Sequence, residues 1–330
     1  MLTILKTLCE TSAAPGNEGA IAKLIAEEVR PYVDEVYTDA LGNLIAHKKG
    51  TGKKLMFAAH MDEIGLVATC YGEKGQVYVA ALGGVTPQTA LYQRVRFSGG
   101  AEGVLVPDGK LDDIAKNLSL QKMYVDLGAK NEEDAKAKVA LGETGVFGGC
   151  FALQGDCVIS KALDNRSGCA ALIYGLQQAK RNVNDLYYVF TVSEELGLRG
   201  AKAAAVSIAP DYAVALDVTP TGDVSSTNKR AVSLGEGVAV KIMDRSFIAH
   251  PIIKDRMVEL CEKHSIPHQL EVLEMGGTDA GAIHLTCGGV PSGCISIPVR
   301  YVHTPGEMIS AKDLQNAGEL AKLLIEEGIE

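Results

Sequence analysis

The sequence predicts an α/β protein with a mixed central sheet, helices on both faces of that sheet, and an inserted small β-rich domain. Three observations predict this class. Apolar strand-like runs alternate with amphipathic helical patterns over 1–63 and 158–330, which is typical of a sheet covered by helices. The run 53–59 (KKLMFAA) is almost continuously apolar, as in strands buried on both faces. From 64 to 157, glycine is frequent and short alternating runs replace the helical patterns.

These sequence patterns predict two domains in the chain of 330 residues, and a chain of this length also favours two domains. A discontinuous main domain is expected at 1–63 and 158–330, and the β-rich insert at 64–157.

Local patterns predict the elements of the first half in order. A helix is expected at 2–9, and Asn17 can cap a second helix whose apolar stripe begins at Ile21. A hairpin is expected at 34–49, before the buried strand 53–59. The insert is expected to hold strands at 76–82, 93–97 and 103–106 and one helix at 131–140.

After residue 158 the alternation of strands and helices returns. Helices are expected at 165–179, 200–206, 251–263, 279–285 and 311–326, and strands at 186–192, 212–216, 269–273 and 293–297. A hairpin-like pair is expected within 231–243, around Gly235 and Gly237.

Composition narrows the class of partners. Hydrophobic residues make up 47% and charged residues 22%, an ordinary globular composition. The net charge of −9 and the lack of basic clusters argue against nucleic acid as a ligand, and no apolar run approaches the roughly 18–20 residues that span a bilayer. Eight scattered cysteines without a C-x-x-C pair, and an N-terminus without a secretory pattern, predict reduced thiols in the cytoplasm.

Histidine and acidic side chains occur where predicted strands end or just beyond them. In open α/β sheets, ligands bind outside the carboxyl ends of the strands. Taken alone, Asp164 would be a helix cap, Glu194 and Glu195 a solvated turn, and His303 a buried histidine. Their occurrence at five strand ends favours a metal site instead. The candidate residues are His60, Asp62, Asp164, Glu194, Glu195, Asp217 and His303.

The spacings support this interpretation. His60 and Asp62 are two residues apart and point to the same side of an extended chain, so one can ligate a metal while the other orients it. Glu194 and Glu195 are adjacent and diverge. One can ligate while the other holds the attacking water as a general base.

Charge counting favours two metal ions over one. Asp164, Glu195 and Asp217 together contribute −3, so one divalent ion leaves −1 and two leave +1, which a shared hydroxide neutralises. Two ions bridged by one carboxylate suit hydrolysis. Mixed histidine and carboxylate ligation fits zinc, cobalt or manganese.

Six segments bear on the family of the chain. They are 59–65 (AHMDEIG), 161–168 (KALDNRSG), 191–201 (TVSEELGLRGA), 215–218 (ALDV), 276–281 (GGTDAG) and 300–305 (RYVHTP). Together they resemble the TET-type dinuclear metallo-aminopeptidases, a family of glutamyl, leucyl and deblocking aminopeptidases that is also labelled cellulase M-like. The resemblance covers essentially the whole chain, and Asp164-Asn165-Arg166 separates it from the Asp-x-Lys-Gly motif of related dimetal carboxypeptidases and deacylases.

The resemblance implies a role for each candidate. His60, Asp164 and Asp217 hold one metal ion. Asp164 bridges to a second ion, which Glu195 and His303 also hold. Glu194 is the general base and acid, and Asp62 supports His60. Thr278, Asp279 and Glu307 are expected near the site, as candidate substrate contacts.

The resemblance also implies the activity and the assembly. It implies an aminopeptidase that removes N-terminal residues from peptides with a free N-terminus, using two divalent ions, zinc or cobalt first, to activate a bridging water. The main domain would then be the catalytic metallopeptidase domain, and the insert would serve dimer formation within a homo-oligomeric dodecamer.

Three other functions stay open. One is a dimetal deacylase or carboxypeptidase, and another is the endoglucanase activity of the cellulase M label, which the absence of Trp and an aromatic content of 5% disfavour. The third is a non-enzymatic assembly protein, which would need no metal.

Overall fold

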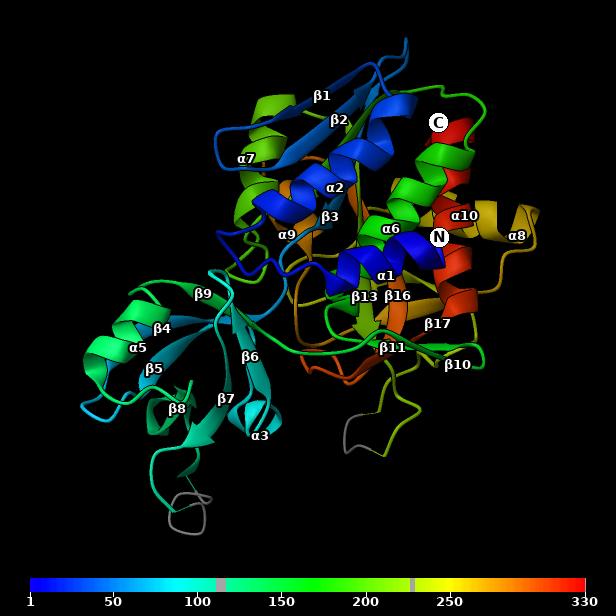
Figure 1. Ribbon diagram of the computed structural model, residues 1–330. Helices are drawn as coiled ribbons and strands as arrows, with labels where there is room; N and C mark the ends of the chain where they lie inside the picture. The colour runs from blue at the N-terminus through cyan, green and yellow to red at the C-terminus, as the bar shows by residue number, and fades with distance from the viewer. Residues whose placement is uncertain (111–116, 226–228, 330) are drawn as a thin grey trace.

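The computed structural model of the chain describes residues 1–110, 117–225 and 229–329 and has two parts (Figure 1). The larger part contains both termini and is a mixed sheet with helices, and the smaller part is β-rich. The predicted fold class is therefore confirmed, including the small β-rich insert.

The described strands of the larger part form one 11-stranded sheet, in which β14 and β15 join the main order through β16. The main order is β1-β2-β12-β3-β13-β16-β17-β11-β10. These strands are β1 (Glu35–Thr38), β2 (Leu44–Lys48), β3 (Lys54–His60), β10 (Ala152–Gln154), β11 (Cys157–Ser160), β12 (Asp185–Thr191), β13 (Tyr212–Pro220), β14 (Val238–Met243), β15 (His268–Val272), β16 (Ser292–Arg300) and β17 (Glu307–Ser310).

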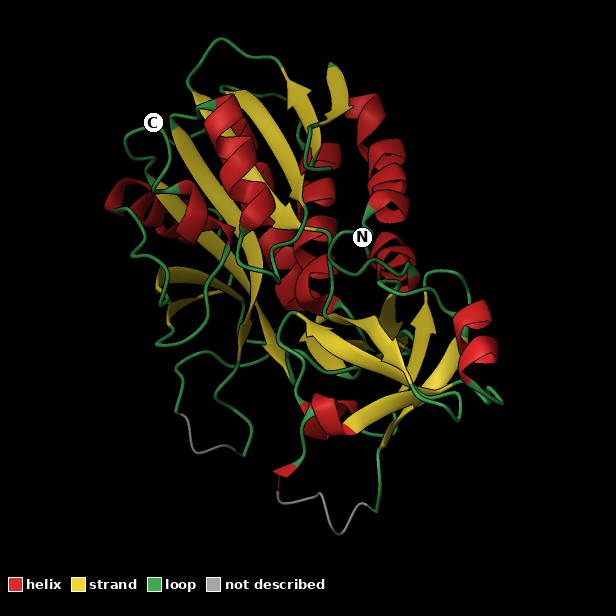
Figure 2. Cartoon of the chain, turned by 90° about the vertical axis from the view of Figure 1, so that its left-hand side faces the viewer, coloured by secondary structure: helices red, strands yellow, loops and turns green. Residues whose placement is uncertain are grey.

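Helices cover both faces of this sheet (Figure 2). On one face α6 packs against the central strands, with α1, α2, α8 and α10 beside it, while α7 and α9 cover the other face. The helices are α1 (Leu2–Glu10), α2 (Gly19–Val29), α6 (Leu163–Gln178), α7 (Arg199–Ile208), α8 (Pro251–Lys263), α9 (Asp279–Ile283) and α10 (Ala311–Glu327), and the short η1 (Arg30–Tyr32) follows α2.

The four central strands, β12, β3, β13 and β16, run parallel. Their carboxyl ends therefore meet at one edge of the sheet. Along that edge Thr191 pairs with His60, and Asp217 pairs with Ser296. This register brings the segments that follow β3 and β12 next to Asp217.

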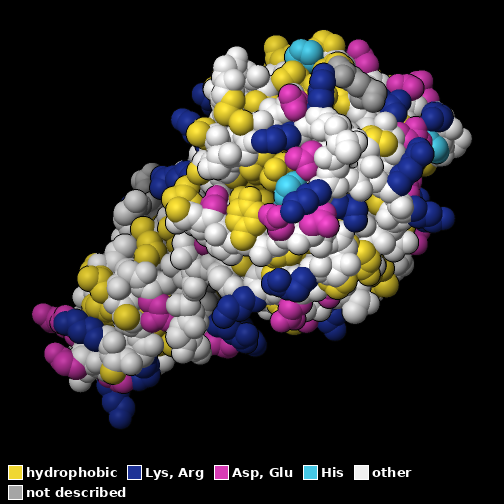
Figure 3. Space-filling model, turned by 90° about the horizontal axis from the view of Figure 1, so that it is seen from above, with side chains coloured by type: hydrophobic (Ala, Val, Ile, Leu, Met, Phe, Trp, Pro, Cys, Tyr) yellow, Lys and Arg dark blue, Asp and Glu magenta, His cyan; other side chains and the backbone are white. Residues whose placement is uncertain are grey.

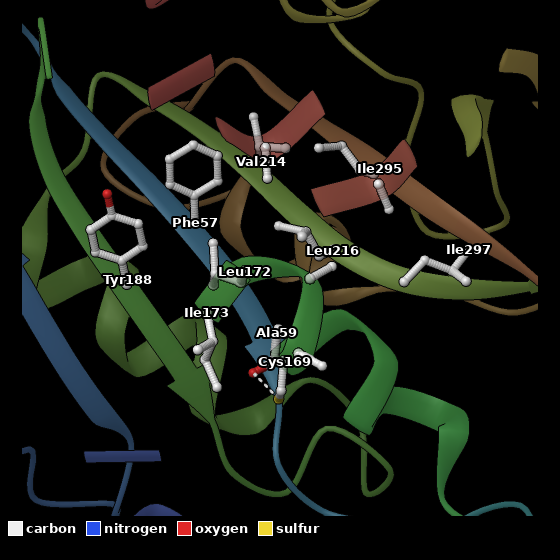
Figure 4. Close-up of a cluster of buried hydrophobic side chains, with 14 of the residues drawn as sticks. Phe57, Ala59, Cys169, Leu172, Ile173, Tyr188, Val214, Leu216, Ile295 and Ile297 are labelled. Atoms are coloured by element: carbon white, nitrogen blue, oxygen red, sulfur yellow. Dashed lines mark hydrogen bonds between the residues drawn. The ribbon is translucent and has the colours of Figure 1, made fainter. Parts of the chain in front are cut away.

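The central strand β3 is buried on both faces, as its apolar run predicts. Leu55 and Phe57 belong to the core under α6, whereas Met56 and Ala58 belong to the core under α7. Figure 4 shows Phe57 with apolar side chains of the neighbouring strands and of α6, and a hydrogen bond from the thiol of Cys169 to the carbonyl of Ala59. This packing fixes α6 against the end of β3, where the candidate site begins.

The β-rich part is a closed barrel in the order β4-β5-β8-β7-β6-β9, with a separate apolar core. Its elements are β4 (Gly65–Tyr71), β5 (Val77–Leu82), α3 (Pro87–Ala90), β6 (Arg94–Phe97), β7 (Glu102–Pro107), η3 (Leu120–Lys122), β8 (Met123–Asp126), α5 (Glu132–Lys138) and β9 (Thr144–Phe147). The last barrel strand ends at Phe147, and the next strand, β10, pairs with β11 of the large sheet. Judged by strand pairing, the insert therefore ends about ten residues before the expected boundary at 157. The division of the chain into domains remains a proposal.

Two local predictions are wrong. Asn17 does not cap α2, which begins at Gly19, and its side-chain amide instead donates to the hydroxyl of Thr144 in the barrel. The hairpin expected within 231–243 is absent from the described residues, because β14 pairs in parallel with β15 and antiparallel with β16. In both cases a partner distant in sequence replaces the expected local one.

The surface and the cysteines agree with the composition. On the face shown in Figure 3, acidic and basic side chains are interspersed. The eight cysteines are free. Among the described helices, none has the length and apolar character to cross a membrane.

Candidate metal centre

The candidate residues come from five segments and meet at the carboxyl edge of the central strands. Asp217 lies within β13, which continues to Pro220, beyond the predicted strand 212–216. The other segments place their residues at or just after element ends. His60 ends β3, Asp164 lies at the start of α6, Glu194 and Glu195 follow β12, and His303 follows β16.

Asp164 lies at the centre of the cluster. One of its carboxylate oxygens, Oδ1, is 3.0 Å from Nε2 of His60, and the other, Oδ2, is 3.3 Å from Nε2 of His303. Nε2 of His303 is also 3.3 Å from a carboxylate oxygen of Glu195, and Nε2 of His60 is 3.7 Å from Asp217. The two oxygens of one carboxylate thus face two histidines, as a bridging ligand requires.

Among the described residues, two groups of donor atoms are compact enough to hold a metal ion. His60, Asp164 and Glu195 form one, and His60, Glu194 and Asp217 form the other, with the atoms of each group within 4.8 Å of one another. Glu194 therefore lies as close to the other donor atoms as the candidate ligands do, and distance alone does not distinguish it from a ligand. Its assignment as a base and not a ligand is a proposal that follows the resemblance.

Neighbouring carboxylates control the charge of both histidines. Burial lowers the pKa of His60, but the charge of Glu194 and the hydrogen bond with Asp164 outweigh it and hold the pKa well above its ordinary value. Burial likewise opposes protonation of His303, yet contacts with Asp164 and Glu195 raise its pKa to about 11. The neighbouring carboxylates therefore favour the protonated form of both rings.

The carboxylates of the cluster have histidines as their described positive partners. Burial, followed by nearby carboxylates, raises the pKa values of Glu194 and Asp217 well above their ordinary range. Over the described residues, the ion pairs of Asp164, Glu194, Glu195 and Asp217 are with histidines and not with Lys or Arg. Several buried carboxylates without a fixed cation are costly, and divalent ions are the chemical complement of this donor set.

Asp62 supports the cluster in two ways. Its carboxylate accepts hydrogen bonds from the amides of Glu194 and Glu195, both at 3.1 Å. Its own carbonyl oxygen lies 3.1 Å from Nδ1 of His60, whereas its carboxylate is 3.6 Å from that atom. Asp62 thus contacts His60, as expected, and also fixes the backbone of Glu194 and Glu195. Sequence spacing alone does not reveal this second contact.

Asn165 and Arg166 anchor Asp164 from behind. Both are completely buried. The side-chain amide of Asn165 donates to the carbonyl of Leu216, and the guanidinium of Arg166 donates to the carbonyl of Leu8 and to Glu63. The Asp-Asn-Arg motif therefore ties the central carboxylate to β13 and to α1.

Glu307 points toward the backbone of two candidate ligands. Its carboxylate accepts hydrogen bonds from the amides of Asp164, at 3.0 Å, and His303, at 2.9 Å. It is 2% exposed, so both oxygens are engaged within the protein. Asp279 is equally buried and accepts a hydrogen bond from the hydroxyl of Thr191. The described contacts of Glu307 and Asp279 are thus with the protein itself, and their expected contacts with substrate stay predictions.

We expect Glu307→Gln to weaken metal binding about 10–100-fold, as removal of a supporting partner commonly does, because the new NH2 group cannot accept from a backbone N–H and one of the two hydrogen bonds is lost. The matched control is Asp313→Asn, since Asp313 likewise accepts from two amides, those of Gly235 and Gly237, away from the site. Both variants should lose about 1–3 kcal/mol of stability. Calorimetric metal titration separates them, and unchanged affinity in Glu307→Gln would contradict this role.

A cavity of about 490 Å³ opens over the cluster, within the usual range for small-ligand sites. It is lined by the metal-ligand candidates together with apolar Leu273 and Met275, and by Gly84 from the barrel. Sequence reasoning missed these last three residues. None of the three carries a titratable side chain, so no chemical signal marks them.

Comparison with known proteins supports one interpretation of this site. The family model of the M42 glutamyl aminopeptidases matches residues 42–320. A protein from Acetivibrio thermocellus is 50% identical over 326 residues, which are 99% of this chain and 98% of that protein.

Two solved structures are similar over nearly the whole chain. An aminopeptidase from the archaeon Desulfurococcus kamchatkensis has a TM-score of 0.94 and 39% identity, covering 98% of this chain and 94% of that one. The TET1 peptidase of Pyrococcus horikoshii has a TM-score of 0.89 and 29% identity, covering 99% of each chain. These matches favour the aminopeptidase prediction over the deacylase and endoglucanase alternatives, and the chain belongs to the M42 glutamyl aminopeptidase family.

Proposed function

We propose that this chain is a metal-dependent aminopeptidase whose centre holds two divalent ions, with zinc or cobalt favoured and manganese also compatible. The observation that carries this proposal is the position of Asp164, whose two carboxylate oxygens face His60 and His303. The excess of buried carboxylates over fixed positive charge supports it.

The chain's own residues divide between two ion positions. His60, Asp164 and Asp217 would hold one ion, and Asp164, Glu195 and His303 the other. Two divalent ions, when bound, would supply Lewis-acid polarisation of the first peptide carbonyl and lower the pKa of a bound water. Asp62 orients His60 and fixes the backbone of the glutamate pair.

Glu194 is the proposed proton carrier. Its carboxylate is 3.9 Å from Nε2 of His60 and lines the cavity, so it lies beside the ligands and faces the substrate. It would accept a proton from the attacking water and deliver it to the leaving amine.

The function is tested with chelator-treated protein. Aminoacyl chromogenic substrates should be hydrolysed only after zinc, cobalt or manganese is added back, and N-acetylated forms of the same substrates should not be hydrolysed. Cleavage of acylated but not free-amine substrates would indicate a deacylase. Activity that survives complete metal removal would contradict the proposal.

Metal binding should release protons, and its apparent affinity should rise with pH. The pKa of His303 is raised to about 11 and that of His60 is raised well above its ordinary value, so both rings hold protons at neutral pH. Those protons must leave before Nε2 can bind a metal ion. Calorimetry in buffers of different ionisation enthalpy measures the release directly. An affinity that does not change between pH 6 and pH 8 would contradict this prediction.

The assembly and the location are proposed on similarity. The Pyrococcus horikoshii TET1 peptidase is described as assembling into a tetrahedron or a large octahedral shell, and a dodecamer built from dimers is the proposed state here. The proposed substrates are peptides with a free N-terminus, and the proposed location is the cytoplasm.

A further inference from the structure

We propose that the inserted barrel supplies part of the metal centre, because its Gly83-Gly84 turn positions the side chains of Glu195 and His303. The turn lies between β5 and α3 and is tight, since the amide of Val85 donates to the carbonyl of Gly83 at 2.9 Å. Gly84 lines the same cavity as the candidate ligands. A turn of the β-rich domain therefore reaches the site that the large sheet builds.

The turn and the two ligand side chains approach closely at both glycines. A Cβ atom on Gly84 would lie 2.3 Å from Nδ1 and 2.6 Å from Cε1 of His303. A Cβ atom on Gly83 would lie 2.7 Å from Oε2 and 3.0 Å from Cβ of Glu195, and the φ of Gly83 is +84°. Backbone at these two positions thus packs directly on the side chains of two candidate ligands.

The ring of His303 needs such a support. Its Nε2 must face both Asp164 and Glu195, each at 3.3 Å, while its side chain is 36% exposed and its φ is +59°. A ligating histidine usually donates its second ring N–H to an acceptor, whereas the contacts of this ring with described acidic residues run through Nε2, to Asp164 and Glu195. The Gly84 backbone lies against the Nδ1 edge of the ring and limits its rotation by contact.

One part of this inference rests on the proposed function, namely that His303 holds a metal ion. If it does, Gly84→Ala should weaken one of two cobalt(II) ions about 10–100-fold and leave the other unchanged. The probe is cobalt(II) titrated into chelator-treated protein and followed by calorimetry and visible absorption. The matched control is Gly306→Ala, because a Cβ atom there meets nothing within 4 Å, and it should bind cobalt as the unaltered protein does.

A double-mutant cycle on the metal-free protein tests the contact without any metal or activity. Gly84→Ala should lower the thermal unfolding midpoint by roughly 2–6 °C through overpacking. In a His303→Ala background the same change should cost less than about 1 °C, since the methyl group enters the space that the ring leaves. This result would stand even if the proposed function failed.

Equal drops in the two backgrounds would overturn the inference, as would two tightly bound cobalt ions in Gly84→Ala. If Gly84→Ala alone does not fold, the Gly84→Ala/His303→Ala double variant decides. A folded double variant supports the contact between the barrel and the ring, and an unfolded one overturns it.

Discussion

Replacing Glu194 with glutamine is expected to lower kcat by roughly 10³-fold or more, because one group serves as both base and acid. Glutamine has nearly the same size and shape as glutamate, so the backbone N–H of residue 194 should still donate to Asp62, as it does in the unaltered protein. Metal content should therefore stay at two ions per subunit. The measurements are kcat on an aminoacyl chromogenic substrate and metal analysis of the same protein sample.

The neighbouring residue provides the control. Glu195→Gln makes the same chemical change one position along, but it removes a carboxylate that lies 3.3 Å from Nε2 of His303. We expect Glu195→Gln to lose one ion and Glu194→Gln to keep both. Near-normal turnover in metal-loaded Glu194→Gln would rule out the proton-carrier role, and loss of an ion from Glu194→Gln would make it a ligand.

Replacing Asp164 with asparagine is expected to abolish both metal sites. Each carboxylate oxygen of Asp164 faces a different histidine, and an amide group can supply only one oxygen to that pair. Activity should fall below about one-thousandth of that of the unaltered protein, because the chemistry depends on both ions. The measurement is metal stoichiometry after dialysis, alongside activity.

Asp217→Asn is the comparison for this prediction. Asp217 lies 3.7 Å from Nε2 of His60, whereas the described carboxylate contacts of His303 are with Asp164 and Glu195, so the loss of Asp217 should weaken one ion and leave the other. A protein with Asp164→Asn that retains two tightly bound ions would show that Asp164 is not the bridge. Unfolding of either variant would appear in its circular dichroism spectrum before metal analysis.

Much of the fold could be predicted because the strongest signals are local. The apolar run of β3 predicts burial on both faces, and the structure shows cores on each side of it. The same holds for α8, whose bounds of Pro251–Lys263 coincide with the predicted helix 251–263, which begins with proline. Elements of this kind depend on side-chain patterns that a short window of sequence contains.

Predictions failed where a distant partner outweighed the local pattern. Asn17 has the chemistry of a helix cap, yet it bonds Thr144 in another domain. The segment around Gly235 and Gly237 has the pattern of a hairpin, yet carboxylate oxygens of Asp313 hold both glycine amides and β14 joins the large sheet. Neither competitor is visible within a local window.

For the site itself, the sequence alone shows the ligand types and their order. His60, Asp164, Glu194, Glu195, Asp217 and His303 are recognisable because each follows a strand pattern, and parallel strands end at a common edge. In the structure these side chains lie close together, and their roles stay predictions. Which of the two glutamates serves as the base is a question of orientation, and the answer comes from the proposed mechanism and its test.

The supports of the site depend on contacts between segments far apart in the chain. Glu307 holds the amide of Asp164 from 143 positions away, and Gly83 and Gly84 pack on Glu195 and His303 from the end of a barrel strand. Glycine carries no chemical signal, and a carboxylate that accepts backbone hydrogen bonds looks in sequence like any other acid. Ligand chemistry is a property of single side chains, so it is visible in the sequence, whereas positioning is a property of packing and appears only when the chain is folded.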